Sequence, residues 1–234
     1  MKIEVFFRHN DVKPKDIEGR HIVVIDVLRA TTVIATALGN GAASVRTVAE
    51  VTEAFQIKEN RPDVLLAGER DALKVSGFRF GNSPLEMKNH VIQDKHIVMT
   101  TSNGTKAVAI ASGAKSIRLA SFVNMAAVVE DMLQILEDFA IICSGTNGQF
   151  SLDDVLAAGI LVNRLKKKTE VVLTDSSILA ALAVKDETQL SEYLKDCFHL
   201  NVLKDRGFQA DIDYCLSLDI LDVVPLFVNG EFII

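Results

Sequence analysis

Two kinds of apolar segment alternate along most of the chain. Short runs rich in β-branched residues, typical of strands, occupy 22–25, 64–66, 97–101, 141–143 and 171–173. Stretches rich in Ala and Leu, with apolar residues at helical spacing, occupy 32–38, 51–58, 106–111, 123–136 and 155–165. This alternation predicts an α/β protein with three layers, α/β/α, in which helices cover both faces of a mostly parallel or mixed sheet.

One part of the chain resembles another. The segment from residue 22, IVVIDVLRATTVIATALGNGAASVR, matches the segment from residue 96, HIVMTTSNGTKAVAIASGAKSIR, in its strand, polar loop, helix and second strand. A third segment, AIICSGTNGQFSLDDVLAAGIL from residue 140, begins in the same way. The match predicts an internal duplication; the alternative is that all βαβ units look alike. Because no linker interrupts the chain, we expect one domain, 1–234, with related halves at about 20–90 and 95–170.

The last third of the chain has a different pattern. Residues 176–216 indicate helices, with a break at Arg206-Gly207. The end, VVPLFVNGEFII, indicates a hairpin, because two apolar runs flank Asn229-Gly230, a type I′ turn pair. Pro225 predicts that this hairpin lies at a sheet edge. We therefore expect a C-terminal helical segment and an edge hairpin.

Four polar loops follow the predicted strands, where ligands bind in open α/β sheets. In the first loop, 26–32, Asp26 closes a strand and suits a divalent cation. Arg29 suits bidentate binding of an anionic oxygen. Thr31 and Thr32 open the next helix and could cap it or bind an anion. The alternative is a capping loop with a surface arginine.

The second loop begins after the strand that contains 64–66. There Glu69 suits a metal ion, and Arg70 or Arg79 suits an anion. Asn82 or Ser83 is placed to cap the helix that follows. The alternative is a long loop with a capped helix and no ligand.

The third loop, 100–105, consists almost entirely of hydroxyl and amide side chains. Thr101, Ser102, Asn103, Gly104 and Thr105 precede a helix, whose N-terminal N–H groups would complete a binding site for an anion. The alternative is a simple capping loop.

The fourth loop, 143–154, contains Ser144 and Gly145 at the strand end as further candidate ligands of the substrate. Ser151, with Asp154 three residues on, predicts an N-cap with a capping box. Asp153 and Asp154 are candidate metal ligands.

Charge and composition narrow the possible partners. Acidic residues outnumber basic ones 31 to 25, giving a net charge of −6, which argues against nonspecific nucleic-acid binding. No apolar run reaches the ~18 residues of a membrane helix, and the first ten residues lack the apolar segment of a signal peptide. Three cysteines without a CxxC pair fit a reducing cytoplasm, and we expect Cys143 to be a small buried residue.

Taken in order, the loops resemble one family. The motifs are DVLRATT (26–32), LLAGER (65–70), GFRFGNSPLE (77–86), TTSNGTKA (100–107), CSGTNGQFSLDD (143–154) and GFQADIDYCLSLDILDVVP (207–225). Together they resemble the 2-phosphosulfolactate phosphatase family over nearly the whole chain. The pattern differs at Ser102 and at Leu200, which follows His199; for the second reason we assign His199 no role.

The resemblance implies a magnesium-dependent hydrolase that releases phosphate from 2-phospho-3-sulfolactate in coenzyme M biosynthesis. We expect Asp26, Arg29, Glu69 and Arg70 to be catalytic, with Mg²⁺ held by Asp26, Glu69 and either Asp154 or Asp153. The other polar residues of the loops would bind the anionic, phosphorylated substrate. Three alternatives stay open: a phosphatase of another organophosphate, a noncatalytic binder of anionic metabolites, and a structural α/β module. A homodimer is possible because of the hairpin.

Overall fold

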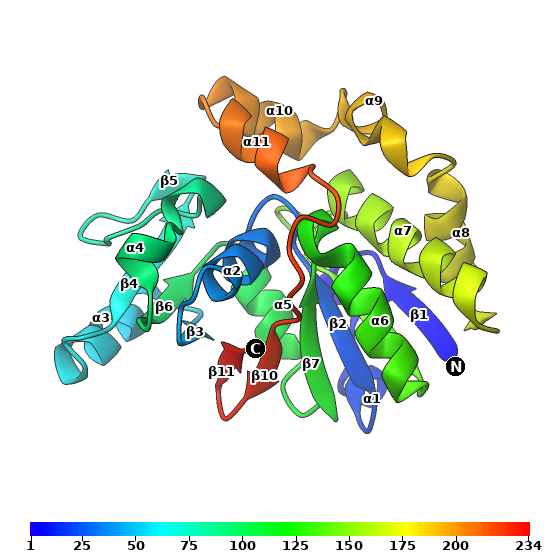
Figure 1. Ribbon diagram of the computed structural model, residues 1–234, viewed down its shortest axis with the longest axis horizontal. Helices are drawn as coiled ribbons and strands as arrows, with labels where there is room; N and C mark the ends of the chain where they lie inside the picture. The colour runs from blue at the N-terminus through cyan, green and yellow to red at the C-terminus, as the bar shows by residue number, and fades with distance from the viewer.

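The computed structural model describes residues 1–234 and contains a single sheet of 11 strands (Figure 1). The strands are β1 (Lys2–Phe6), β2 (His21–Ile25), β3 (Ser44–Thr47), β4 (Leu65–Arg70), β5 (Leu73–Lys74), β6 (His96–Thr100), β7 (Ser116–Ala120), β8 (Phe139–Cys143), β9 (Val172–Leu173), β10 (Leu226–Val228) and β11 (Glu231–Ile233). The helices are α1 (Pro14–Ile17), α2 (Ala30–Gly39), α3 (Val51–Asn60), α4 (Asn89–Ile92), α5 (Gly104–Ile110), α6 (Met125–Ile135), α7 (Leu152–Lys168), α8 (Asp175–Ala183), α9 (Leu190–Leu194), α10 (Phe198–Asp205) and α11 (Gln209–Cys215).

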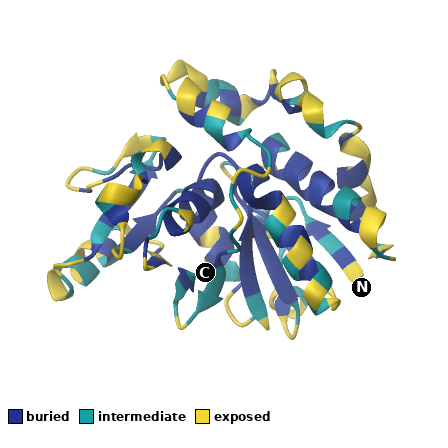
Figure 2. Cartoon of the chain, viewed as in Figure 1, coloured by how far each residue is buried: buried dark blue, intermediate teal, exposed yellow.

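Helices cover both faces of this sheet, which confirms the three-layer prediction. Alternate residues of β2 show how: Val23 and Ile25 join the core formed with α6, α7 and α8, whereas Ile22 and Val24 join the core formed with α2 and α5. Strand β2 (Figure 2) and strand β8 are buried over their whole length, so they lack the polar alternation of a half-exposed strand.

The two similar segments pair with each other. Strand β2 pairs in parallel with β7, and β3 pairs in parallel with β6. The first strand of each copy therefore lies beside the second strand of the other copy. Helices α2 and α5, which connect these strands, pack against each other. This exchange is the arrangement that two duplicated units would produce, and the duplication itself stays a prediction.

The C-terminal hairpin forms as expected, but its predicted place is wrong. Asn229 and Gly230 have φ of 51° and 89°, as a type I′ turn requires. The hairpin lies in the middle of the sheet, where β10 pairs with β7 and β11 pairs with β3, both antiparallel. Pro225 precedes β10, so its missing N–H removes no bond between strands, and its carbonyl accepts the N–H of Leu119.

The C-terminal helical segment forms α8 to α11, with the expected break between α10 and α11. Helices α10 and α11 lie across the carboxyl ends of the strands, above the N-terminus of α2 (Figure 1). The chain thereby covers the end of the sheet at which all four polar loops lie.

Candidate active site

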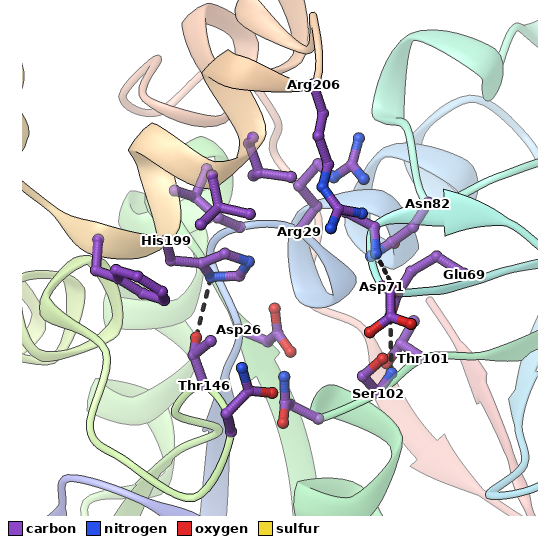
Figure 3. Close-up of a pocket in the computed structure, with 17 residues that line it drawn as sticks. Asp26, Arg29, Glu69, Asp71, Asn82, Thr101, Ser102, Thr146, His199 and Arg206 are labelled. Carbon is purple, nitrogen blue, oxygen red and sulfur yellow. Dashed lines mark hydrogen bonds between the residues drawn. The ribbon is translucent and has the colours of Figure 1, made fainter.

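A cavity of about 250 Å³ lies between the strand-end loops and α10 (Figure 3). Its size is just below the ~300–1,000 Å³ typical of sites for drug-sized ligands, so it suits a small metabolite. The polar residues that line it are Asp26, Arg29, Glu69, Asp71, Asn82, Thr101, Ser102, Asn103, Thr146, Asn147, His199 and Arg206. Seven of the predicted site residues are in this set: Asp26, Arg29, Glu69, Asn82, Thr101, Ser102 and Asn103.

Asp26 follows β2 and directs its carboxylate toward the middle of the cavity (Figure 3). Its Oδ1 accepts the backbone N–H of Ala30 at 3.0 Å. Gly104 closes the other side, because a Cβ there would lie 2.6 Å from Oδ2. Burial raises the pKa of Asp26, and the Ala30 N–H and the nearby His199 partly oppose that rise. The site therefore holds one carboxylate in a tight, largely dry position.

Arg29 is held from the C-terminal segment. Its guanidinium is 2 % exposed, donates to Asp211 of α11 and lies 4.2 Å from the centre of the Phe208 ring. The other oxygen of Asp211 accepts the hydroxyl of Ser83 at 2.7 Å. Ser83 precedes Pro84, as predicted for the start of that turn, but its side chain holds Asp211 instead of capping. Arg29 is thus fixed in a direction that leaves it lining the cavity.

Glu69 and the loop after β6 form the opposite wall. Glu69 accepts two backbone N–H groups, from Ala72 and Ser102, each at 2.7 Å. These bonds fix the positions of Ser102 and Asn103 at the cavity. Nearby, the buried Oδ1 of Asn82 has no hydrogen-bond partner in the chain. An unpartnered buried oxygen on the lining is suited to accept a hydrogen bond from a ligand.

Helix α10 forms the roof and carries residues that the sequence patterns missed. His199 faces the cavity above Asp26, and Arg206 reaches toward it from the end of the helix (Figure 3). The only signal at Arg206 was the helix break, and the departure from the family pattern at Leu200 argued against His199. Both residues reach the site only because the C-terminal segment folds back over the strand ends.

A comparison with known proteins agrees with these motifs. A model of the family described as 2-phosphosulpholactate phosphatase matches residues 6–230. The chain belongs to this family. It is 42 % identical over 228 residues to a Clostridium novyi protein, covering 97 % of each chain. It is 41 % identical over 235 residues to one from Clostridium perfringens strain SM101 (99 % of this chain, 95 % of the relative). A Caldanaerobacter subterraneus relative is 39 % identical over 233 residues (98 % and 97 %).

Each of these relatives is named a probable 2-phosphosulfolactate phosphatase. The family name denotes a phosphoric monoester hydrolase, so the family is one of enzymes. No helix of the chain has the length and apolar character needed to span a membrane.

In this member of the 2-phosphosulfolactate phosphatase family, several predicted site residues lie outside the cavity lining. Arg70 donates to the carbonyls of Glu69 and Ala49 and to the hydroxyl of Thr100, and Arg79 is exposed beside Phe80. Buried hydroxyls bond to the backbone. The hydroxyl of Thr31 lies 2.8 Å from the carbonyl oxygens of both Asp26 and Ala120 and shares its one proton between them. Thr32 donates to the carbonyl of Val27, and Thr105 to that of Thr101. Gly104, Ser144 and Gly145 shape the loops from behind the lining.

Asp153 and Asp154 also lie behind the cavity. Asp154 accepts the N–H groups of Val27 and Gly145 and the hydroxyl of Ser144, at 2.9 to 3.0 Å. The predicted capping box is therefore wrong, since this carboxylate joins two loops and does not bond to Ser151. Burial, Asp153 and Asp26 raise the pKa of Asp154 well above its usual range. As expected, Cys143 is a small buried residue, and burial raises the pKa of its thiol.

The predicted carboxylates do not converge on one point. No group of three or more Asp, Glu, His or Cys side chains is arranged to hold a metal ion. Asp26 and Glu69 line the cavity, whereas Asp154 is buried behind the lining. A metal ion in this cavity would therefore have at most a few protein ligands and would need water or substrate oxygens for the rest.

Proposed function

We propose that this chain hydrolyses 2-phospho-3-sulfolactate to 3-sulfolactate and phosphate, as a step of coenzyme M biosynthesis in the cytoplasm. The observation that carries the proposal is the cavity itself. It brings the buried Asp26 and Arg29 together with Asn103 and Arg206 in a chain whose relatives bear that name. Residues from all four strand-end loops and from α10 support this arrangement.

The proposed substrate carries a phosphate, a sulfonate and a carboxylate. Arg29 and Arg206 line the cavity and suit these anionic groups, because a guanidinium can donate two parallel hydrogen bonds to one anion. The polar loop from Thr101 to Asn103 offers hydroxyl and amide groups for the remaining oxygens. Arg29 is suited to orient the reacting group, since its contacts with Asp211 and Phe208 fix its position before any ligand binds.

The charges of the lining favour a divalent cation as cofactor. Three carboxylates, Asp26, Glu69 and Asp71, face the cavity with only two arginines, so the walls alone do not neutralise a substrate with three anionic groups. Mg²⁺ commonly uses one or two protein carboxylates and completes its shell with water and phosphate oxygens, which fits a cavity without a closed ligand set. Asp26 and Glu69 would hold it. When bound, the ion would offset negative charge on the phosphoryl group.

The test measures phosphate release from 2-phospho-3-sulfolactate with Mg²⁺ and with EDTA. We expect release only with the metal ion, and a loss of at least about 100-fold in Asp26→Asn. Asp222→Asn is the matched control, because Asp222 is exposed and is not among the residues that line the cavity. Activity of Asp26→Asn within about threefold of the wild type would remove Asp26 from the chemistry.

A panel of other phosphomonoesters separates the alternatives. Faster release from a different ester would assign another organophosphate as the substrate. Binding of the esters without release from any of them, with Mg²⁺ present, would indicate a noncatalytic binder of anionic metabolites.

A further inference from the structure

Hydrolysis of an alkyl phosphate leaves an alkoxide, which needs a proton as the bond between phosphorus and oxygen breaks. We propose that His199 gives this proton from its Nε2, and that a chain of hydrogen bonds through Thr146, Ser151 and Asp153 fixes the imidazole for this role. The inference rests on the proposed function and adds a catalytic residue and three positioning residues to it.

The hydrogen-bond chain begins at the ring of His199. Nδ1 lies 3.1 Å from Oγ1 of Thr146 (Figure 3), which lies 3.3 Å from Oγ of Ser151, which lies 2.5 Å from Oδ1 of Asp153. Ser151 and Asp153 are 4 % and 1 % exposed, so water does not compete for the bond between them. The four residues come from three elements: α10, the loop after β8 and the start of α7.

The direction of each proton follows from the donors available. Ser151 donates to Oδ1 of Asp153, where a carboxylate oxygen is the acceptor. The single hydroxyl proton of Ser151 is then used, so Thr146 donates to Ser151. The hydroxyl proton of Thr146 is used in turn, so Thr146 accepts from Nδ1–H of His199. The chain of bonds holds a proton on Nδ1 and leaves Nε2 to exchange a proton with the cavity.

The second observation is the other oxygen of Asp153. Oδ2 is buried and has no hydrogen-bond partner, which is costly for a residue with no role beyond packing. The thiol of Cys197, two residues before His199, also lies 3.9 Å from Oδ1 of Asp153. Asp153 therefore anchors both the hydrogen-bond chain and the start of the helix that carries His199.

The surroundings of His199 suit a proton donor to an anion. The charged groups that share the cavity with it are Asp26, Arg29, Glu69, Asp71 and Arg206. Asp153 is linked to Thr146 through Ser151. The arginines are placed to bind the anionic groups of the substrate.

The step balances without a further reactant. Water attacks phosphorus as the bond from phosphorus to the alkyl oxygen breaks, and the imidazolium of His199 gives the Nε2 proton to that oxygen. The attacking water becomes part of H₂PO₄⁻. His199 then regains a proton from this product, which leaves as HPO₄²⁻.

The decisive test compares leaving groups. An alkyl phosphate, 2-phospho-3-sulfolactate, needs the proton, whereas p-nitrophenyl phosphate releases a stable phenolate without it. We expect His199→Asn to lower kcat for the alkyl ester by about 10²- to 10⁴-fold and to change kcat for the aryl ester far less. An equal loss with both esters would overturn the proposal. His90→Asn is the matched control, because His90 is exposed on α4.

A second measurement needs no turnover and keeps the hydrogen-bond chain testable by itself. In ¹⁵N NMR spectra we expect the neutral ring of His199 to carry its proton on Nδ1. We expect Thr146→Val to lose this preference and to lower kcat for the alkyl ester by about tenfold, the worth of one hydrogen bond. Thr52→Val on the exposed face of α3 is the control. A dominant proton on Nε2 in the wild type would refute the chain.

The two proposals fail in different ways. If the wild type releases no phosphate from either ester, the proposed function is wrong, and the NMR result alone decides the hydrogen-bond chain. If the wild type is active and His199→Asn loses nothing on the alkyl ester, the function stands and the role of His199 is wrong.

Discussion

The ion pair between Arg29 and Asp211 allows stability and activity to be separated. Both side chains are buried, with 2 % and 6 % of their surfaces exposed, so solvent screens their attraction little. Asp211→Asn keeps the shape and one acceptor oxygen for Arg29, with the amide N–H donating to the hydroxyl of Ser83, but it leaves the guanidinium without a countercharge. Removing one partner of a buried pair costs about 3–5 kcal/mol, and the amide oxygen retained in Asn places our expectation at the lower end, about 3 kcal/mol.

For a chain of this length, a loss of about 3 kcal/mol corresponds to a fall in Tm of roughly 6–12 °C. Urea unfolding of the wild type and Asp211→Asn measures the loss directly. The double variant Arg29→Met, Asp211→Leu removes both charges and keeps apolar volume, so we expect it to recover most of the stability and none of the activity. A loss below about 0.5 kcal/mol in Asp211→Asn would refute the reasoning, since that is the cost at an ordinary surface site.

Three further predictions concern other residues in and around the site. Gly104→Ala would place its Cβ 2.6 Å from Oδ2 of Asp26, so we expect phosphate release to fall about tenfold or more while thermal unfolding shows a folded protein. Arg79→Met should leave kcat/KM within about twofold. Arg70→Met should lower stability by about 1 kcal/mol, because Arg70 donates to the carbonyls of Glu69 and Ala49 and to the hydroxyl of Thr100. An equal effect of the two substitutions on urea unfolding would contradict this difference. Because the pKa of Asp154 is raised in the folded chain, folded Asp154 keeps a proton that the unfolded chain loses near pH 4. The stability that this proton contributes is therefore lost as pH rises from about 4 toward the folded pKa. When the free energy of unfolding is measured across that pH range, we expect it to decline less with rising pH in Asp154→Asn than in the wild type.

The strand-end rule explains which parts of the site the sequence predicts. Asp26, Glu69 and the loop from Thr101 to Asn103 each follow a buried strand, and parallel strands bring their carboxyl ends to one edge. The same pleat separates Glu69 from Arg70: adjacent residues of a strand point to opposite sides, so one lines the cavity and the other bonds to the loop at Ala49.

The roof of the cavity lies beyond any local pattern. His199 and Arg206 belong to helices whose periodicity predicts their existence but not their position over the strands. Their position depends on contacts far apart in the sequence, such as Arg29 with Asp211 and Thr146 with His199. The central place of the hairpin has the same origin, because Pro225 is compatible with an edge and with a position just before a central strand.

The exchange of strands between the two similar segments has a consequence for any division of the chain. The group β5-β4-β6-β3 and the group β7-β2-β8-β1-β9 lie on opposite sides of the hairpin, and each contains strands from both segments. If the chain were cut between α4 and β6, each fragment would carry unpaired strand edges from both groups. Each would also carry only one wall of the cavity, with Asp26 and Glu69 in the first fragment and Asn103 in the second. Such fragments can complete their sheet only by association, so complementation in trans is the route by which a divided enzyme would regain its site.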